Sequence, residues 1–257
     1  MAVRGILFDK DGTLLDLGGT WLPPYRQAAE FLSGLTDCPG MTDSLMKAGG
    51  YDPDTGQWTF DSTLASGSND EVLEVWESRL GFPLSADTRA HIRETFFHAS
   101  VRHVPAVDDL AGLIGGLRRR GLVLGLATMD DEAGARIMLK QFGLAESFGF
   151  VCGADSGFGV KPDPGMVRAF SDACALRLDD IMVVGDSPKD LHMARNAGAG
   201  VAVGVLSGAH DGGQLACDAD ILLDSIADLP KILDFPVADR AAAASGGQLE
   251  SGAGPRI

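Results

Sequence analysis

The chain has little positive charge, few cysteines and no long apolar run. Of its 257 residues, 21 are basic and 36 are acidic, which gives a formal net charge of −15. This balance argues against binding to the phosphate backbone of a nucleic acid or to an anionic membrane surface. An anionic small substrate would therefore need local positive charge or a metal ion. Since no stretch of about 18 consecutive apolar residues occurs, we expect no membrane span.

The four cysteines are widely spaced and include no C-x-x-C pair. They therefore indicate neither a zinc site nor a disulfide framework. The amino terminus has no basic segment followed by a long apolar core, so we expect a cytoplasmic protein. A Walker A pattern is also missing, because G-F-G-V-K-P at residues 157–162 lacks the required spacing. A loop that cradles a nucleotide is therefore not expected, and nothing in the sequence indicates an oligomeric state.

Residues 17–104 differ in character from the rest of the chain, because all three tryptophans lie there. Residues 27–35 and 70–80 have the apolar spacing of helices, and the second is preceded by an S-x-x-E capping box that begins at Ser68. Between these helices, residues 51–60 carry an Asp-Thr-Gly turn that predicts a hairpin. The segment therefore reads as a separate, mainly helical module.

From about residue 105 onward, strand-like and helical segments alternate. The predicted strands cover 122–128, 148–153, 181–186, 200–205 and 220–223, and the predicted helices cover 108–121 and 131–143. A further helix is expected to start with Asp163 as its N-cap and Pro164 at its first position. This alternation predicts an α/β fold with a doubly wound parallel sheet. Residues 236–257 are rich in Gly, Ala and Ser, which is typical of a flexible tail.

Residues 5–16, GILFDKDGTLLD, run from an apolar segment directly into two acids. Ile6, Leu7 and Phe8 are typical of a strand buried on both faces, so Asp9 would stand at its carboxyl end, where open α/β sheets bind ligands. Other predicted strands also lead into polar residues. The resulting candidate site residues are Asp9, Asp11, Thr128, Lys161, Asp186 and Asp190. A single Asp after a strand is usually a turn or helix-cap residue, but this ordered set favours a site.

Four segments, DKDGT, LGLAT, VKPDP and GDSPKD, resemble in this order the four motifs of the haloacid dehalogenase superfamily. The resemblance covers roughly residues 1–235. It implies an α/β core formed by residues 1–16 and 105–235, with a mainly helical cap inserted at residues 17–104. It also implies a Mg²⁺-dependent enzyme of the capped phosphatase branch, similar to phosphoglycolate phosphatases, which hydrolyses a small phosphomonoester.

The resemblance assigns the chemistry first to three aspartates. Asp9 would attack phosphorus and form an aspartyl-phosphate, and Asp11 would act first as the acid and then as the base. Mg²⁺ prefers hard oxygen ligands, which here would be the Asp9 carboxylate, the Asp11 backbone carbonyl and Asp186.

The resemblance also assigns the groups that would bind the phosphoryl oxygens. Thr128 and the backbone amides of Met129 and Asp130 would donate hydrogen bonds to them, and Lys161 would supply positive charge. Asp190 would position Lys161 or a metal-bound water. Lys10 departs from the apolar residue that is common at this place in the small-molecule phosphatases, and the sequence assigns it no role.

Two alternatives remain open at this stage, a sugar phosphomutase and a receiver domain. The phosphomutase of the same family would use the same motifs, whereas the dehalogenase branch is not expected because it lacks the second acid, Asp11. A signalling receiver domain also combines an Asp, a Thr and a Lys, but it needs only about half of this chain. Within the module, Trp21, Tyr25, Arg26 and the loop at 65–70 are candidates for substrate contact, although core packing is the stronger expectation for Trp21 and Tyr25.

Overall fold

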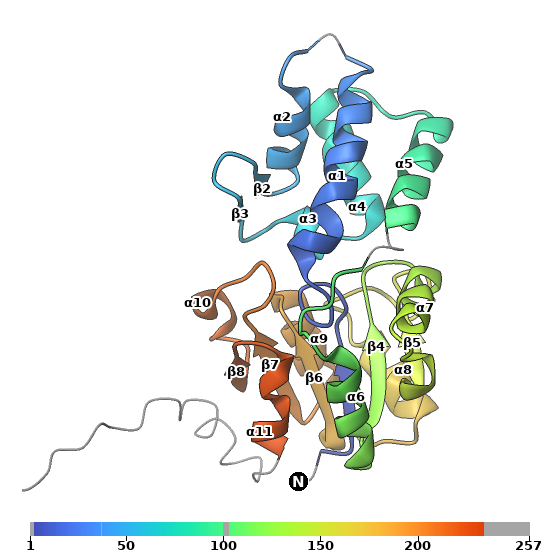
Figure 1. The fold of residues 1–257 in the computed structure, drawn as a ribbon, viewed down its shortest axis with the longest axis vertical. Helices are drawn as coiled ribbons and strands as arrows, with labels where there is room; N and C mark the ends of the chain where they lie inside the picture. Colours follow the sequence, from blue (N-terminus) through green and yellow to red (C-terminus); the bar gives the residue numbers. More distant parts are fainter. Residues whose placement is uncertain (1–2, 37, 100–102, 234–257) are drawn as a thin grey trace, which may run out of the picture.

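The structure is a computed structural model that describes residues 3–36, 38–99 and 103–233. Its main sheet has six parallel strands, drawn in Figure 1. These are β1 (Gly5–Phe8), β4 (Val123–Ala127), β5 (Phe150–Cys152), β6 (Ile181–Gly185), β7 (Val201–Val205) and β8 (Ile221–Leu223). The strand order β5-β4-β1-β6-β7-β8 places β1 inside the sheet, with the chain winding outward on both sides of it. The predicted doubly wound parallel sheet is confirmed.

Helices cover both faces of this sheet. One face packs against α6 (Leu110–Arg119), α7 (Glu132–Gln141) and α11 (Leu229–Leu233). The other face packs against α8 (Gly165–Ala173), α9 (Pro188–Ala197) and α10 (Gly212–Leu215). Short 3₁₀ helices complete the core at Ala145–Ser147, Leu178–Asp180 and Ile226–Asp228. In β1, Ile6 and Phe8 face the first layer and Leu7 faces the second, which explains why this strand is apolar at every position.

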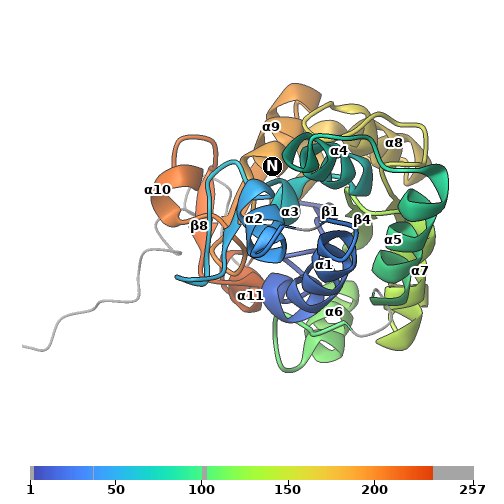
Figure 2. The same ribbon diagram turned by 90° about the horizontal axis from the view of Figure 1, so that it is seen from above.

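A second body lies over the carboxyl ends of the strands, as Figures 1 and 2 show from two sides. It contains α1 (Leu17–Ser33), α2 (Met41–Ala48), β2 (Tyr51–Asp52), β3 (Gln57–Trp58), α3 (Thr63–Ser66), α4 (Asn69–Leu80) and α5 (Ala86–Ala99). An apolar cluster around Trp76 and Phe96 gives this body a core of its own. We propose that residues 17–104 form an inserted cap domain and that residues 1–16 and 105–235 form the core domain.

Two local predictions within the cap are confirmed. Residues 51–60 form an antiparallel hairpin in which Tyr51 pairs with Trp58. Helix α4 begins after Ser68, whose hydroxyl and Glu71 form the reciprocal capping box. Helix α1 is longer than the predicted segment at 27–35, because Asp16 caps it at Leu17.

The predicted start of α8 is wrong. The helix begins at Gly165, with Pro164 at the N-cap and no side-chain capping bond. The backbone N–H of Asp163 donates to the Val160 carbonyl at 2.8 Å, so Asp163 closes a turn instead of capping the helix. Gly165 lies so close to the Phe158 carbonyl that a Cβ atom there would approach it to 1.8 Å, so the helix can begin here only with glycine.

The described part of the chain contains no helix whose length and apolar character would suffice to cross a membrane. The predicted flexible tail at 236–257 lies outside the described residues.

Candidate active site

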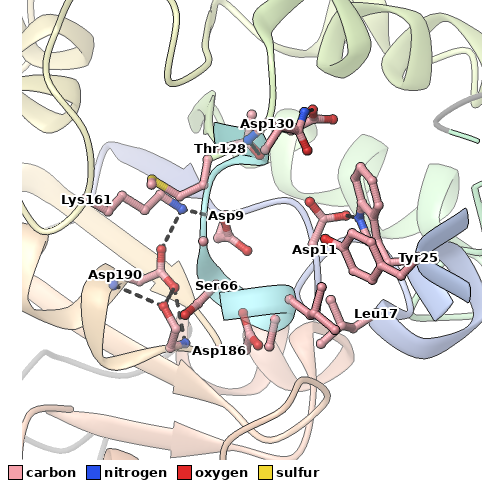
Figure 3. Close-up of a pocket in the computed structure, with 17 residues that line it drawn as sticks. Asp9, Asp11, Leu17, Tyr25, Ser66, Thr128, Asp130, Lys161, Asp186 and Asp190 are labelled. Atoms are coloured by element: carbon pink, nitrogen blue, oxygen red, sulfur yellow. Dashed lines mark hydrogen bonds and ion pairs between the residues drawn. The ribbon is translucent and has the colours of Figure 1, made fainter. Parts of the chain in front are cut away.

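The polar residues at the strand ends lie together beneath the cap (Figure 3). Asp9 follows β1, Thr128 follows β4 and Asp186 follows β6, and these three strands are neighbours in the sheet. Their carboxyl ends therefore meet at one edge, where the winding of the chain changes direction. Lys161 reaches this edge from the loop before α8, and Asp190 reaches it from the first turn of α9.

Lys161 forms a buried ion pair with two carboxylates. Its ammonium donates to Oδ1 of Asp190 at 2.6 Å and to Oδ1 of Asp9, and only 4% of the residue is exposed. Burial opposes the charge of Lys161, but Asp190 and Asp9 outweigh burial and raise its pKa above the ordinary value. Lys161 therefore carries a fixed positive charge in the pocket.

The acids of the site repel one another. Burial, together with the charges of Asp190 and Asp11, raises the pKa of Asp9 to about 7, although Lys161 opposes this shift. Burial and the same kind of repulsion, from Asp9 and Asp190, raise the pKa of Asp186 well above its ordinary value. The ammonium of Lys161 cannot compensate all three carboxylates of Asp9, Asp186 and Asp190, so negative charge is left in a buried site.

This excess of negative charge suits a divalent cation. Carboxylate oxygens of Asp9, Asp186 and Asp190 lie within 4.8 Å of one another, and all three residues are buried. Hard oxygen donors are the ligands that Mg²⁺ prefers. Both carboxylate oxygens of Asp190, however, already have hydrogen-bond partners. Oδ1 accepts from the Lys161 ammonium. Oδ2 accepts from the hydroxyl of Ser187 at 2.6 Å and from its backbone N–H at 3.1 Å. Asp190 therefore holds Lys161 and caps α9, and the ligand set of Asp9, the Asp11 carbonyl and Asp186 stays a prediction.

The loop after β4 contributes Thr128, Met129 and Asp130 to the lining of the pocket. Thr128 is held by a bond from its N–H to the Cys152 carbonyl at 3.0 Å. The Asp130 amide, predicted to bind a phosphoryl oxygen, donates to Thr128 Oγ1 at 3.1 Å in this structure. Burial raises the pKa of the Cys152 thiol to about 12, so Cys152 is not a thiolate nucleophile near neutral pH.

The cap closes the pocket with aromatic side chains from α1. Trp21 and Tyr25 line it and stack with their ring centroids 5.3 Å apart, and both also pack in the cap core, as expected. The indole Nε1 of Trp21 donates to Oδ1 of Asp11 at 2.5 Å. Arg26 does not reach the pocket. Arg26 follows Tyr25 in α1, so it lies on a different face of the helix. Its side chain is half exposed, and its guanidinium lies 3.9 Å from the Asp43 carboxylate.

The predicted loop at 65–70 does reach the site. Ala65, Ser66, Gly67 and Asn69 line the pocket, and Leu64 lies beside them. Lys189, on α9 of the core, donates to the Ser66 carbonyl at 3.1 Å. This contact ties the cap loop to the core directly above the acids.

His210 is a second link between cap and core, and sequence reasoning missed it. Its Nδ1 lies 3.1 Å from the Asp186 carbonyl oxygen, and its Nε2 lies 2.9 Å from the Phe60 carbonyl oxygen. No sequence pattern marks this histidine, because its partners lie 24 and 150 residues away. The cavity that the pocket residues line has a volume of about 30 Å³, which is enough to hold water.

Comparison with known proteins assigns the class to which this fold and site belong. A family model for haloacid dehalogenase-like hydrolases matches residues 3–198. The chain belongs to this family, which confirms the resemblance seen in its four motifs.

Individual relatives make the comparison more specific. The phosphoglycolate phosphatase of Rhodospirillum rubrum is 30% identical over 215 residues, which cover 78% of each chain. A solved structure from Haemophilus somnus, described as a predicted phosphoglycolate phosphatase, has a TM-score of 0.66 at 21% identity and covers 90% of this chain and 97% of its own. A candidate beta-phosphoglucomutase from Thermotoga maritima has the same TM-score at 19% identity and covers 90% and 99%. At these identities the two solved structures show a shared fold.

Proposed function

We propose that this hydrolase is a Mg²⁺-dependent phosphatase that cleaves a small phosphomonoester through an aspartyl-phosphate on Asp9. The observation that carries the proposal is the placement of Asp9 and Asp11, which face one pocket together with the cationic Lys161 (Figure 3). A receiver domain would not account for the cap that covers these acids. Because of the relatives named above, phosphoglycolate is the first substrate to test.

In the proposed first step, a carboxylate oxygen of Asp9 attacks phosphorus and the bond to the leaving oxygen breaks. Asp11 protonates that oxygen as it leaves. In the second step, Asp11 takes a proton from water, the water oxygen attacks phosphorus, and phosphate leaves with Asp9 restored. Burial raises the pKa of Asp11, while Lys10 and Trp21 oppose this shift. A raised pKa suits a carboxyl group that has to give a proton and later take one.

The other residues would stabilise charge on the transferring group. Lys161 carries a fixed positive charge, and Thr128 and the Met129 amide offer hydrogen-bond donors in the same pocket. A Mg²⁺ ion bound by Asp9, the Asp11 carbonyl and Asp186 would neutralise the repulsion between carboxylate and phosphate. The cap would open for substrate and close to exclude bulk water during transfer.

A phosphate-release screen tests the proposal. We expect turnover of a subset of small phosphomonoesters that requires Mg²⁺ and is lost in Asp9→Asn, a nearly isosteric variant that cannot attack phosphorus. Turnover by Asp9→Asn near the wild-type rate would refute the covalent mechanism. Interconversion of sugar phosphates that needs a bisphosphate activator and releases little phosphate would instead identify the phosphomutase alternative.

A further inference from the structure

Lys10 is a fully buried lysine between the two catalytic acids in sequence, and no step of the proposed reaction uses it. Its exposed fraction is 0%, which is rare for a lysine because an ammonium is costly to remove from water. Its charge is nevertheless retained, since Asp11 and Asp130 outweigh burial and raise its pKa. A buried charge of this kind needs specific partners.

The ammonium of Lys10 has three N–H donors and, among the described residues, lies close to two carboxylates and one aromatic ring. It lies 2.6 Å from Oδ2 of Asp130, 3.4 Å from Oδ2 of Asp11 and 5.2 Å from the centre of the Trp21 ring. An ammonium over an indole face is attracted to its π electrons. Lys10 is thus held by two carboxylates and one aromatic ring.

These three partners come from different parts of the molecule. Asp11 follows β1, Asp130 follows β4, and Trp21 belongs to α1 of the cap. The cap also contacts both acids directly, because Trp21 donates to Asp11 and Asn69 donates to Asp130 at 3.3 Å. Lys10 therefore joins two strand-end loops and the cap at one point.

We infer that Lys10 is a positioning residue that fixes the Asp11 carboxylate for proton transfer to and from the reacting oxygens, with Asp130 as its anchor. Asp11 has the Trp21 indole on one oxygen and the Lys10 ammonium on the other, so its carboxylate is held at both ends. This inference rests on the proposed function, because it presumes that Asp11 is the acid and base.

Stability alone is a weak reason for such an arrangement. Apolar side chains of similar size commonly replace buried ion pairs without loss of stability. Asp130 is hydrogen-bonded to Asn69 and to the Asp131 amide as well, so the anchor itself is fixed. A rigid anchor is what positioning requires, since small displacements of an acid from its target oxygen lower its efficiency steeply.

The test compares two leaving groups in the variant Lys10→Met, which keeps an unbranched side chain of similar size and removes its charge. An alkyl phosphate needs a proton on its leaving oxygen, whereas p-nitrophenyl phosphate needs little. We expect kcat/KM, which reports the first phosphoryl transfer, to fall about 10- to 100-fold for the alkyl ester and less than about threefold for the aryl ester. The matched control is Lys140→Met, an exposed lysine in the last turn of α7, which should leave both rates unchanged.

A second variant removes the anchor. Asp130→Asn is nearly isosteric and should show the same selective loss in smaller degree, even if Lys10→Met fails to fold. If both residues act through Asp11, the double variant should lose less than the product of the two single losses. Losses that multiply, an equal loss of kcat/KM with both esters, or wild-type rates in the single variants would overturn the inference. If the variant Asp9→Asn turned over both esters at the wild-type rate, the proposed function itself would be refuted.

Discussion

Trp21 donates a hydrogen bond from its indole nitrogen to Oδ1 of Asp11 at 2.5 Å, although the two residues lie in the proposed cap and core. A hydrogen bond to a charged carboxylate is stronger than one between neutral groups. The bond can form only when the cap lies over the core. In the proposed closure of the cap, this bond would complete the surroundings of the proposed acid and base.

The variant Trp21→Phe tests this relationship. The ring can still stack on Tyr25, but the donor to Asp11 is lost. We expect kcat/KM for alkyl phosphates, which reports the first phosphoryl transfer, to fall roughly tenfold because Asp11 loses one of its fixing contacts, with a smaller effect on aryl phosphates. Steady-state kinetics with both esters measures this. The control Trp58→Phe removes an indole N–H from the hairpin, away from the site, and a similar loss in the control would contradict the assignment.

The variant Asp186→Ala should weaken metal binding. A hard cation with few protein ligands loses one of them, so the Mg²⁺ concentration for half-maximal activity should rise at least about tenfold. Titration of activity with Mg²⁺ measures the change, and Asp163→Ala serves as an acidic control in a nearby turn. An equal loss of activity at limiting and saturating Mg²⁺ would show that Asp186 is not a ligand.

The raised pKa of Asp9 makes a prediction about stability in the absence of metal. The pKa of Asp9 is about 7 in the folded protein, against 3.8 ordinarily, so the folded state keeps a proton that the unfolded chain loses. The contribution of Asp9 to the free energy of unfolding is therefore greatest below pH 4 and falls as the pH rises to about 7.

Chemical unfolding in EDTA measures this contribution as the difference between wild type and Asp9→Asn, which cannot titrate. Between pH 4 and pH 7, the free energy of unfolding of the wild type should fall by up to about 4 kcal/mol relative to that of the variant. Added Mg²⁺ should restore much of this loss at the upper end of the range. If the difference in the free energy of unfolding stayed constant with rising pH, or changed in favour of the wild type, Asp9 would not be a buried acid with uncompensated charge.

Much of the core could be predicted from local patterns. The strands were marked by short apolar runs, and the strand ends carried Asp9, Thr128 and Asp186 because parallel strands bring their carboxyl ends to one edge. The capping box at Ser68 was also readable, since its partner lies three residues away. The start of α8 was misjudged because the turn that engages Asp163 depends on tertiary packing around Gly165.

The contacts between distant residues could not be predicted in this way. Lys10 and Asp130 are 120 residues apart, and His210 and Phe60 are 150 apart. Neither pair leaves a periodic signal in the sequence. Lys10 and Asp130 meet because β1 and β4 are neighbours in the sheet, and His210 meets Phe60 because the cap lies over the core. The contact of Trp21 with Asp11 could not be predicted either, since the sequence indicates only that core packing is a stronger expectation for Trp21 than substrate contact.

The covalent intermediate is tested most directly in the variant Asp11→Asn mixed with p-nitrophenyl phosphate. The aryl group leaves without an acid, but water lacks its base, so the phosphoenzyme should accumulate. We predict a burst of p-nitrophenol of at most about one equivalent per enzyme, and mass spectrometry that places one added phosphoryl group on Asp9. Release of p-nitrophenol and phosphate at equal rates, with no phosphoryl group on Asp9, would contradict the account.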